Sequence, residues 1–394
     1  MFKLKYKSFN YLDLVILLIT LDDVAFNTPF GNLSLSYVGT ALLVFLLKDV
    51  KFKVAGLYDF SLLLLVIWFA FISSFQGSSI LGNLSNLFFT VFAAYLIPKS
   101  SIGLENLVSS IKKVFTLHTL FLIYDFFFDK PWGMGSDNQF YISFNTPDFF
   151  RASGLWGEPS FYCIGINSLY LMLIILKKEK IKESMLLIVT TSMSTSVSGV
   201  ITSFSMILYS YYSRNKIYFK NVVNKKIIHK KFLTSITLLS LILISSSIYL
   251  SNHEFSNRLT KPMEDNSILA RTYGVYLYAQ NSLKESPITG LGLGGDSFKK
   301  SRYDDLSTWV MIGDTPVPIS SVNAFVAILT MGGLVALSLY LLYLFSALGP
   351  PSIIWLIMLL ILVSSGKVFY SLVFLIPAIR KLSLKKRIIS KIKL

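Results

Sequence analysis

Apolar runs recur along the whole chain, and short polar segments separate them. A helix that crosses a lipid bilayer takes about 20 residues, and several of the runs approach that length. The predicted spans cover residues 9–21, 33–47, 57–75, 80–97, 107–128, 158–176, 184–195, 197–213, 232–250, 321–346, 351–364 and 367–379. The pattern predicts an all-α polytopic membrane protein with about 12 transmembrane helices, in a single integral membrane domain over residues 1–394.

Two neighbouring pairs of spans leave an alternative open. The small polar residues of TTSMSTSVSG interrupt 184–213, which favours two short helices that meet at this break, with one long tilted helix as the alternative. The same alternative applies to 351–379, where SSGK separates the two apolar runs.

The basic residues predict an orientation. Most of the 37 Lys and Arg lie between alternate apolar runs and at the two chain ends, as is typical of cytoplasmic segments. Both termini are therefore expected in the cytoplasm, with a basic loop at 214–231 and a basic tail at 380–394. If one of the two doubtful pairs were a single helix, every later segment would change sides and a basic end would lie outside. The charges therefore favour keeping both pairs separate. The two larger loops, about 129–157 and 251–320, are then external, and long loops are often functional.

Composition narrows the class of protein. The chain is 53% hydrophobic and only 15% charged, with a mean hydropathy of +0.61, whereas soluble domains carry about 25% charged residues. The net charge of +16 belongs to the short loops, so nucleic acid is not an expected partner. The single cysteine, Cys163, excludes an intramolecular disulfide and is expected to pack in an apolar run. The segment LDDVAFNTPFGNLS lacks a small-x-small cleavage site, so the first helix is expected to stay uncleaved.

Two charges stand at the external opening of one predicted helix, in RASGLWGEPSFYC. Pro159 suits a first helical turn, and Glu158 before it complements the positive end of the helix dipole. Arg151 can then serve as the salt-bridge partner of Glu158. The alternative is a functional site, because both charges face outward where the protein opens on the membrane.

The second external loop offers further basic residues. NRLTKP contains Arg258 and Lys261, and the segment from about Ser267 predicts a short amphipathic helix with Arg271 in its first turn. A cation is disfavoured at that end of a helix, so an anion nearby would compensate for it.

Glycines and one asparagine complete the candidate residues. In GLGLGG, Gly292 and Gly294 can expose backbone N–H groups to a phosphate, or can serve as a hinge or close-packing segment. Asn323 stands at the external end of the next helix, where it is a helix cap, an interhelical bond or a functional group. Gly332 and Gly333 mark close packing in that helix. The three histidines are scattered without ligand spacing, so neither a metal nor a cofactor is predicted.

Three separated pieces, taken together, resemble the O-antigen polymerase and O-antigen ligase family (Wzy-like and WaaL-like), bacterial membrane glycosyltransferases of the GT-C type. The pieces are RASGLWGEPSFY, SMSTSVSGVITSFSMIL and ARTYGVYLYAQNSLKESPITGLGLGG followed by VNAFVAILTMGGLVAL, over residues 151–337. The resemblance implies a GT-C-like fold in the bacterial cytoplasmic membrane. In this family, arginines of the external loops bind the lipid-linked donor. The resemblance implies the same role for Arg151 and Arg271, which hold the matching positions.

One departure from the family bears on its two branches. Ligases and some polymerases show a His-Asn pair at the start of the helix after the large loop, where this chain reads Val322-Asn323. The missing histidine favours a polymerase, which transfers a growing glycan from undecaprenyl pyrophosphate to a sugar hydroxyl of a lipid-linked repeat unit. The resemblance assigns no catalytic base.

The chemistry of this reaction distributes roles among the candidates. A pyrophosphate leaving group needs fixed cations, and Arg suits phosphate better than Lys. Arg151 and Arg271 are the first choices for this role. The remaining cations are Arg258, Arg302 and Lys261. Glu158 is the best-placed general base, and Trp156 can stack on a sugar or sit in the interfacial belt.

The expected partners are an oligosaccharide linked to undecaprenyl pyrophosphate and membrane lipids, with a chain-length regulator left open. Three alternatives remain: a ligase that transfers polymer to lipid A core, a flippase or transporter of lipid-linked oligosaccharides, and a non-catalytic membrane scaffold. The low number of charges inside the spans and the absence of a visible repeat argue against a transporter.

Overall fold

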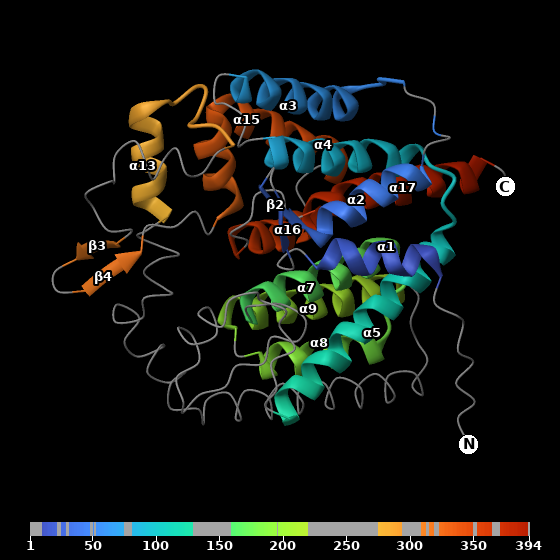
Figure 1. The fold of residues 1–394 in the computed structure, drawn as a ribbon. Helices are drawn as coiled ribbons and strands as arrows, with labels where there is room; N and C mark the ends of the chain where they lie inside the picture. Colours follow the sequence, from blue (N-terminus) through green and yellow to red (C-terminus); the bar gives the residue numbers. More distant parts are fainter. Residues whose placement is uncertain are drawn as a thin grey trace.

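The computed structural model of the chain is mostly helical (Figure 1). The structure describes residues 10–21, 25–28, 31–47, 50, 53–74, 81–128, 159–194, 196–219, 275–293, 309–312, 315–318, 323–349, 353–364 and 371–392. The helices are α1 (Tyr11–Thr20), α2 (Leu35–Leu46), α3 (Leu57–Ser73), α4 (Leu81–Leu96), the 3₁₀ turn η2 (Ile97–Lys99), α5 (Leu104–Phe128), α7 (Pro159–Leu176), α8 (Ile181–Met193), α9 (Val197–Phe219), α13 (Val275–Glu285), α15 (Ala324–Leu348), α16 (Ile353–Ser364) and α17 (Ser371–Ile392). Two antiparallel hairpins, β1 (Ala25–Thr28) with β2 (Gly31–Ser34) and β3 (Trp309–Ile312) with β4 (Thr315–Pro318), add short strands that apolar periodicity did not predict.

The predicted spans coincide with these helices, except for 232–250, which lies outside the described residues. The predicted loop at 129–157 also lies outside them. Two helices extend beyond the predicted apolar run: α9 continues to Phe219, into the basic loop at 214–231, and α17 continues to Ile392, into the basic tail. The rest of the basic loop, from residue 220, is outside the described residues.

Both doubtful pairs are separate helices. Ser194 ends α8 beside Cys163 near the start of α7, with 2.9 Å between Ser194 Oγ and Cys163 Sγ. Ser210, in the second half of α9, donates to Glu179 Oε1 at 2.9 Å, beyond the last turn of α7. The chain therefore reverses between α8 and α9. It also reverses between α16 and α17, because Trp355 near the start of α16 donates to Gly349 O, and Arg380 in the middle of α17 donates to Leu348 O.

Aromatic side chains hold the centre of the bundle together. Tyr343 of α15 stacks on Phe374 of α17 with ring centroids 4.9 Å apart, and its hydroxyl donates to the carbonyl of Phe374 at 2.5 Å. Tyr58 of α3 packs 5.4 Å from Tyr343 and donates to Ala94 O of α4 at 2.7 Å. The Tyr58 and Tyr343 hydroxyls thus each have a backbone acceptor, which removes the penalty of burying these two polar groups.

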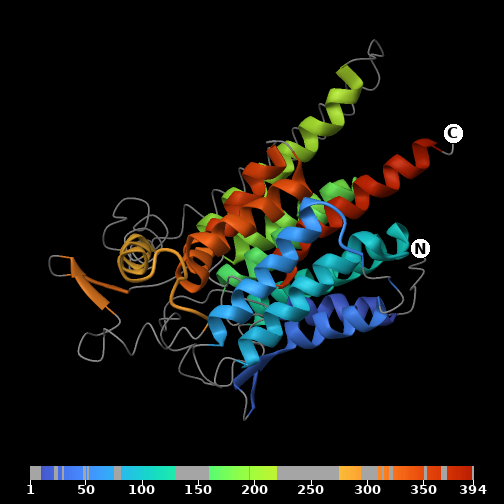
Figure 2. The same cartoon turned by 90° about the horizontal axis from the view of Figure 1, so that it is seen from above.

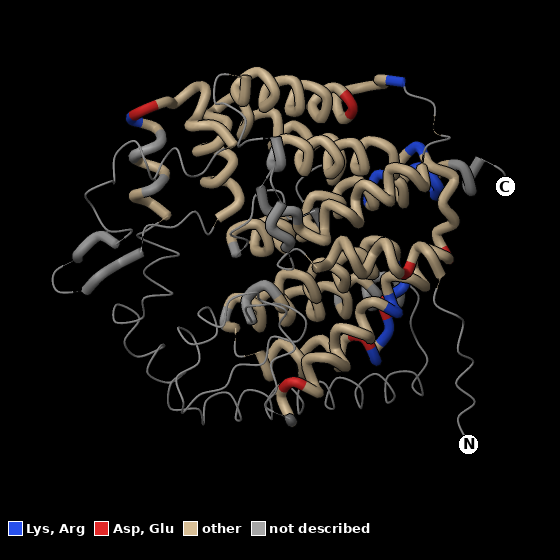
Figure 3. The backbone as a smooth tube through the Cα atoms, in the orientation of Figure 1, with Lys and Arg blue, Asp and Glu red and all other residues tan. Residues whose placement is uncertain are grey.

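Most Lys and Arg positions of the described helices lie at one end of the bundle (Figure 3), whereas Lys284 lies in α13, away from that end. Figure 2 shows the C-terminal parts of α9 and α17 projecting beyond the other helices at this end. Between described residues, three ion pairs occur here: Lys113 with Asp13 at 2.6 Å, Lys112 with Glu183 at 2.9 Å and Lys99 with Asp59 at 2.9 Å. We call it the basic end, and it holds the described parts of 98–113, of KKEKIKE and of the basic tail, for which a common cytoplasmic side was predicted.

The basic tail also binds the ends of other helices. Arg380 Nε donates to Leu348 O at the end of α15 at 3.1 Å, and Arg387 donates to Ile175 O near the end of α7 at 3.1 Å. Lys386 donates to Ile102 O. Cations are favourable at helix C-termini, where carbonyls lack an intrahelical donor. The positive charges of α17 therefore fasten the bundle as well as setting its charge asymmetry.

Apolar stripes cover outward faces of several helices. Along α3, Phe60, Ile67 and Phe71 are 51%, 52% and 52% exposed, and they follow one another at helical spacing. A similar stripe runs along α9 through Ile201 and Leu208. Contiguous exposed apolar surface of this kind marks a contact with lipid or with a partner.

By length and composition, two of the described helices, Leu104–Phe127 and Ala324–Leu348, are long and apolar enough to cross a membrane. Other apolar helices are shorter. For example, α1 has 10 residues and α2 and α16 have 12 each, against about 20 for a straight crossing.

Gly39 sets the distance between α1 and α2 and provides a first prediction. A Cβ at Gly39 would lie 2.6 Å from Ile19 N, which is backbone and cannot yield as a side chain could. Gly39→Ala should therefore destabilise the fold by about 1–3 kcal/mol, the usual range for overpacking. The measurement is thermal unfolding in detergent, followed by the reaction of Cys163 with a thiol-specific dye, since this single cysteine is only 1% exposed.

Gly103→Ala is the matched control. A Cβ there would meet only the Asn106 side chain, at 3.6 Å, which is ordinary contact. Equal unfolding temperatures for the two variants would contradict a close α1–α2 crossing.

Candidate functional site

The first turns of α7 pack against the break between α8 and α9. Cys163 lies in α7, its Sγ is 2.9 Å from Ser194 Oγ, and Ser194 also donates to Thr191 O at 2.8 Å. All of these groups are buried. Cys163, which directly follows the piece RASGLWGEPSFY, therefore contacts Ser194 of the piece SMSTSVSGVITSFSMIL, and it has the packing role expected of it.

A second layer of polar contacts joins α7 to α9. Asn167 Nδ2 donates to Gly199 O at 3.1 Å, while Ser203 Oγ donates to Asn167 Oδ1 at 2.7 Å. A Cβ at Gly199 would overlap Cys163 Sγ and would lie 2.5 Å from Cys163 Cβ. The glycine therefore permits the close approach on which the hydrogen bonds depend, as small residues do in membrane helix pairs.

The third piece forms a separate assembly in which the segment after α13 pairs with a broken helix. Leu291 N donates to Thr330 O at 2.6 Å, Gly292 N to Met331 O at 2.9 Å and Leu334 N to Pro287 O at 2.9 Å. These bonds join α13 to α15, which lie side by side in Figure 1. The segment thus supplies the backbone partners that α15 loses at its break.

Gly333 makes the break in α15. Its φ of 68° and ψ of −168° lie in a region open almost only to glycine. A Cβ on Gly333 would collide with Ile288 O, and one on Gly290 would lie 2.5 Å from Gly333 N. Trp68 of α3 donates its indole N–H to Gly332 O at 2.8 Å, so the carbonyl at the break is also satisfied. The sequence marked Gly333 as a packing glycine, but nothing in it indicated Trp68 as a partner.

The two predicted site residues within the described part of the chain have structural roles. Asn323 caps α15, since its Oδ1 accepts from Phe325 N at 2.9 Å and from Val326 N at 3.4 Å. The amide of Gly292 donates to Met331 O, which fits the close-packing interpretation and leaves this N–H engaged within the protein. The other candidates lie outside the described residues: Arg151, Trp156, Glu158, Arg258, Lys261, Arg271, Gly294 and Arg302.

Both assemblies lie at the end of the bundle opposite the basic end. The far end of α7 is bound by Arg387 and the far end of α15 by Arg380, so the starts of these helices face the other way. Helix α16 packs against α7 and α9 on one side and α15 on the other, which links the two assemblies. Among the described residues, no group of three or more His, Cys, Asp or Glu could hold a metal ion. The assemblies supply rigid helix starts and buried hydroxyls, and the charges that flank them in sequence are Glu158 and Arg271.

No protein-family model matches the chain, and no curated protein matches it either.

The break in α15 provides the second prediction. Gly333→Ala combines backbone strain with a collision against Ile288 O, whereas Gly349→Ala imposes strain alone, because Gly349 has a φ of 76°, a ψ of −161° and open space around its Cβ. Strain of this kind costs about 1–3 kcal/mol. Gly333→Ala should therefore unfold at a clearly lower temperature than Gly349→Ala, measured by the onset of Cys163 labelling. If the two variants unfold together, the segment after α13 does not press on the break.

Proposed function

We propose that this chain is a polytopic membrane protein whose basic end lies in the cytoplasm. Four observations support the placement: the alternation of apolar helices, the exposed apolar stripes on α3 and α9, the two long apolar helices, and the collection of Lys and Arg at one end. Short basic segments stay on the cytoplasmic side during insertion. The opposite end, with the starts of α7 and α15, then faces outward.

Within that placement the proposed activity is polymerisation of a lipid-linked glycan at the outer face of a bacterial cytoplasmic membrane. The observation that carries it is the contact between the start of α7 and the α8–α9 break, because it sets Cys163, directly after the first motif piece, against Ser194 of the second piece. The third piece packs as a unit at the same end of the bundle. O-antigen, capsule and exopolysaccharide chains all fit this chemistry.

The reaction assigns a step to each proposed residue. The acceptor hydroxyl oxygen attacks the anomeric carbon of the donor, the bond from that carbon to the pyrophosphate oxygen breaks, and the hydroxyl proton passes to Glu158. Arg151 and Arg271 stabilise the charge that develops on the pyrophosphate, which is usually the largest catalytic contribution. Glu158 directly precedes Pro159, the first residue of α7, and the tight packing around Cys163 gives this helix start a rigid support.

The membrane placement predicts which positions a reagent can reach. In a Cys163→Ser background, Lys284→Cys in α13 should react with a membrane-impermeant maleimide on intact cells, because α13 lies on the outward side. Lys178→Cys, exposed at the basic end, should react only after permeabilisation. Labelling of residue 178 on intact cells would contradict the orientation.

The activity predicts a change in glycan length. Glu158→Gln and Arg271→Ala should each leave single repeat units without long chains on a polysaccharide gel, because the general base or a pyrophosphate cation is missing. Loss of one positioned proton acceptor lowers a rate by about 10²–10⁴-fold, enough to abolish a ladder. The matched control is Lys284→Ala, which removes an exposed cation from the same external loop and should keep the full ladder.

Full ladders from both variants, at normal expression, would refute the site assignment. The gel also separates the two branches of the family: loss of a polymerase leaves acceptors that carry one repeat, whereas loss of a ligase leaves acceptors that carry none.

A further inference from the structure

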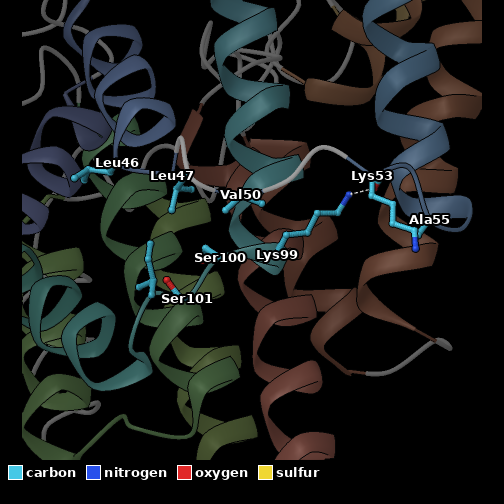
Figure 4. Close-up of a pocket in the computed structure, with 9 residues that line it drawn as sticks. Leu46, Leu47, Val50, Lys53, Ala55, Lys99, Ser100 and Ser101 are labelled. Atoms are coloured by element: carbon cyan, nitrogen blue, oxygen red, sulfur yellow. Dashed lines mark hydrogen bonds between the residues drawn. The ribbon is translucent and has the colours of Figure 1, made fainter.

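A pocket of about 530 Å³ opens at the basic end of the bundle (Figure 4). It lies where the end of α2, the start of α3 and the end of α4 come together. Leu46, Leu47 and Val50 line one side, while Lys53, Lys99 and Ser101 line the other. The neighbouring Ser100 is buried and donates to Ile97 O at 2.8 Å. The pocket therefore has an apolar side and a cationic, hydroxyl-bearing side.

The cationic side is held in place by its neighbours. Lys99 Nζ lies 2.9 Å from Asp59 Oδ2, donates to Lys53 O at 2.5 Å and sits 3.4 Å from the ring centroid of Tyr95. The Lys53 amide donates to the Tyr95 hydroxyl oxygen at 2.8 Å. These contacts fix both the irregular segment that carries Lys53 and the position of the Lys99 ammonium. The site is thus preformed.

Among the residues that the structure describes around the pocket, positive charge exceeds negative charge. Asp59 is the acid here, and it is shared by Lys99 and Lys381, whose Nζ lies 3.8 Å from the Tyr58 ring centroid. Burial lowers the pKa of Lys381, Asp59 raises it, and the positive charge of Lys99 lowers it again. Lys53 adds a further, exposed ammonium. A bound anion would therefore relieve repulsion among these lysines.

The apolar side continues onto the outer surface of the bundle. Phe45 and Leu46, in the last turn of α2, are 66% and 42% exposed. A free phosphate or another small soluble anion would gain nothing from this surface. A ligand that carries a phosphate beside a hydrocarbon chain would use both sides of the pocket, and basic pockets between membrane helices on the cytoplasmic side bind such headgroups.

We propose that this pocket binds an anionic phospholipid of the cytoplasmic leaflet. Its phosphate lies beside Lys53 and Lys99, and an acyl chain lies over Phe45 and Leu46. The site is at the end of the bundle opposite the proposed glycan chemistry. It depends on the proposed membrane placement but not on the polymerase activity.

The test is direct binding to the purified full-length protein after delipidation in detergent, with short-chain phosphatidylglycerol as the probe. Phosphatidylcholine and inorganic phosphate are the comparison probes. Phosphatidylglycerol should bind saturably and at least about tenfold more tightly than either, because only it combines net negative charge with acyl chains. Lys53→Glu should weaken it by about tenfold or more, since one attraction becomes a repulsion.

Two further variants make the result specific. Ser101→Trp should weaken binding without any change of charge, because the indole fills the mouth of the pocket. Lys178→Glu changes an exposed lysine at the same end but outside the pocket, and it should leave the affinity unchanged within about twofold. Protection of Cys163 from the thiol dye verifies that each variant is folded.

Equal losses for Lys53→Glu and Lys178→Glu would overturn the proposal, because binding would then reflect general surface charge. Binding of inorganic phosphate as tight as that of phosphatidylglycerol would also overturn it and would identify a site for a soluble anion. The lipid-binding assay measures no glycan, so its outcome does not depend on whether the chain is a polymerase. Likewise, a failure of lipid binding would not change the ladders on the polysaccharide gel.

Discussion

Backbone groups that are released where a helix ends or breaks must find new partners, and this constraint shapes both ends of the bundle. At the break in α15, Thr330 O and Met331 O accept from the segment after α13, and Gly332 O accepts from Trp68. At the basic end, Leu348 O and Ile175 O accept from arginines of α17. The same requirement explains why the irregular segment after α13 packs against α15 and why the long basic helix α17 reaches the ends of α7 and α15.

Close backbone approach follows from this requirement. The inserted segment can donate to α15 only because Gly290 and Gly333 leave no side chain between the two backbones. Gly199 does the same for α7 and α9, where Asn167 reaches the Gly199 carbonyl. Around these glycines, serine and threonine hydroxyls take up the remaining acceptors, for example Ser203 on Asn167. The small polar residues that interrupt the apolar runs therefore hold the bundle together at the end opposite the basic end.

The two ends of the molecule are thus chemically distinct. The basic end combines fixed lysines with carbonyl-binding arginines, a surface that suits anionic lipid. The opposite end carries the rigid starts of α7 and α15, and the proposed pyrophosphate cations, Arg151 and Arg271, lie in the sequence segments that precede these helices. Its buried hydroxyls fix the start of α7, directly after Glu158 in the chain. In the proposed placement, this division puts the lipid-binding pocket and the proposed glycan transfer at opposite ends of the bundle.

Much of the helical framework could be predicted, because apolar runs and basic loops are local properties of the chain. The prediction placed α3 and α7 within two residues of their observed ends, and the charge argument correctly separated α8 from α9. It did not reveal the hairpins, which carry no strong periodic signal in four-residue strands. Nor did it choose between the cap and the functional roles of Asn323, since that depends on where its Oδ1 points.

The sequence by itself determined the helix order, the charge asymmetry and the set of chemically suitable residues, because each depends on residue type and spacing along the chain. Only the tertiary structure decided that the Gly292 amide is engaged by Met331 O, that Trp68 completes the break in α15, and that Lys53 and Lys99 share a pocket with Leu46. These are contacts between segments as many as 264 residues apart. They depend on how closely helices pack, and packing distance is set by side chains on both partners at once.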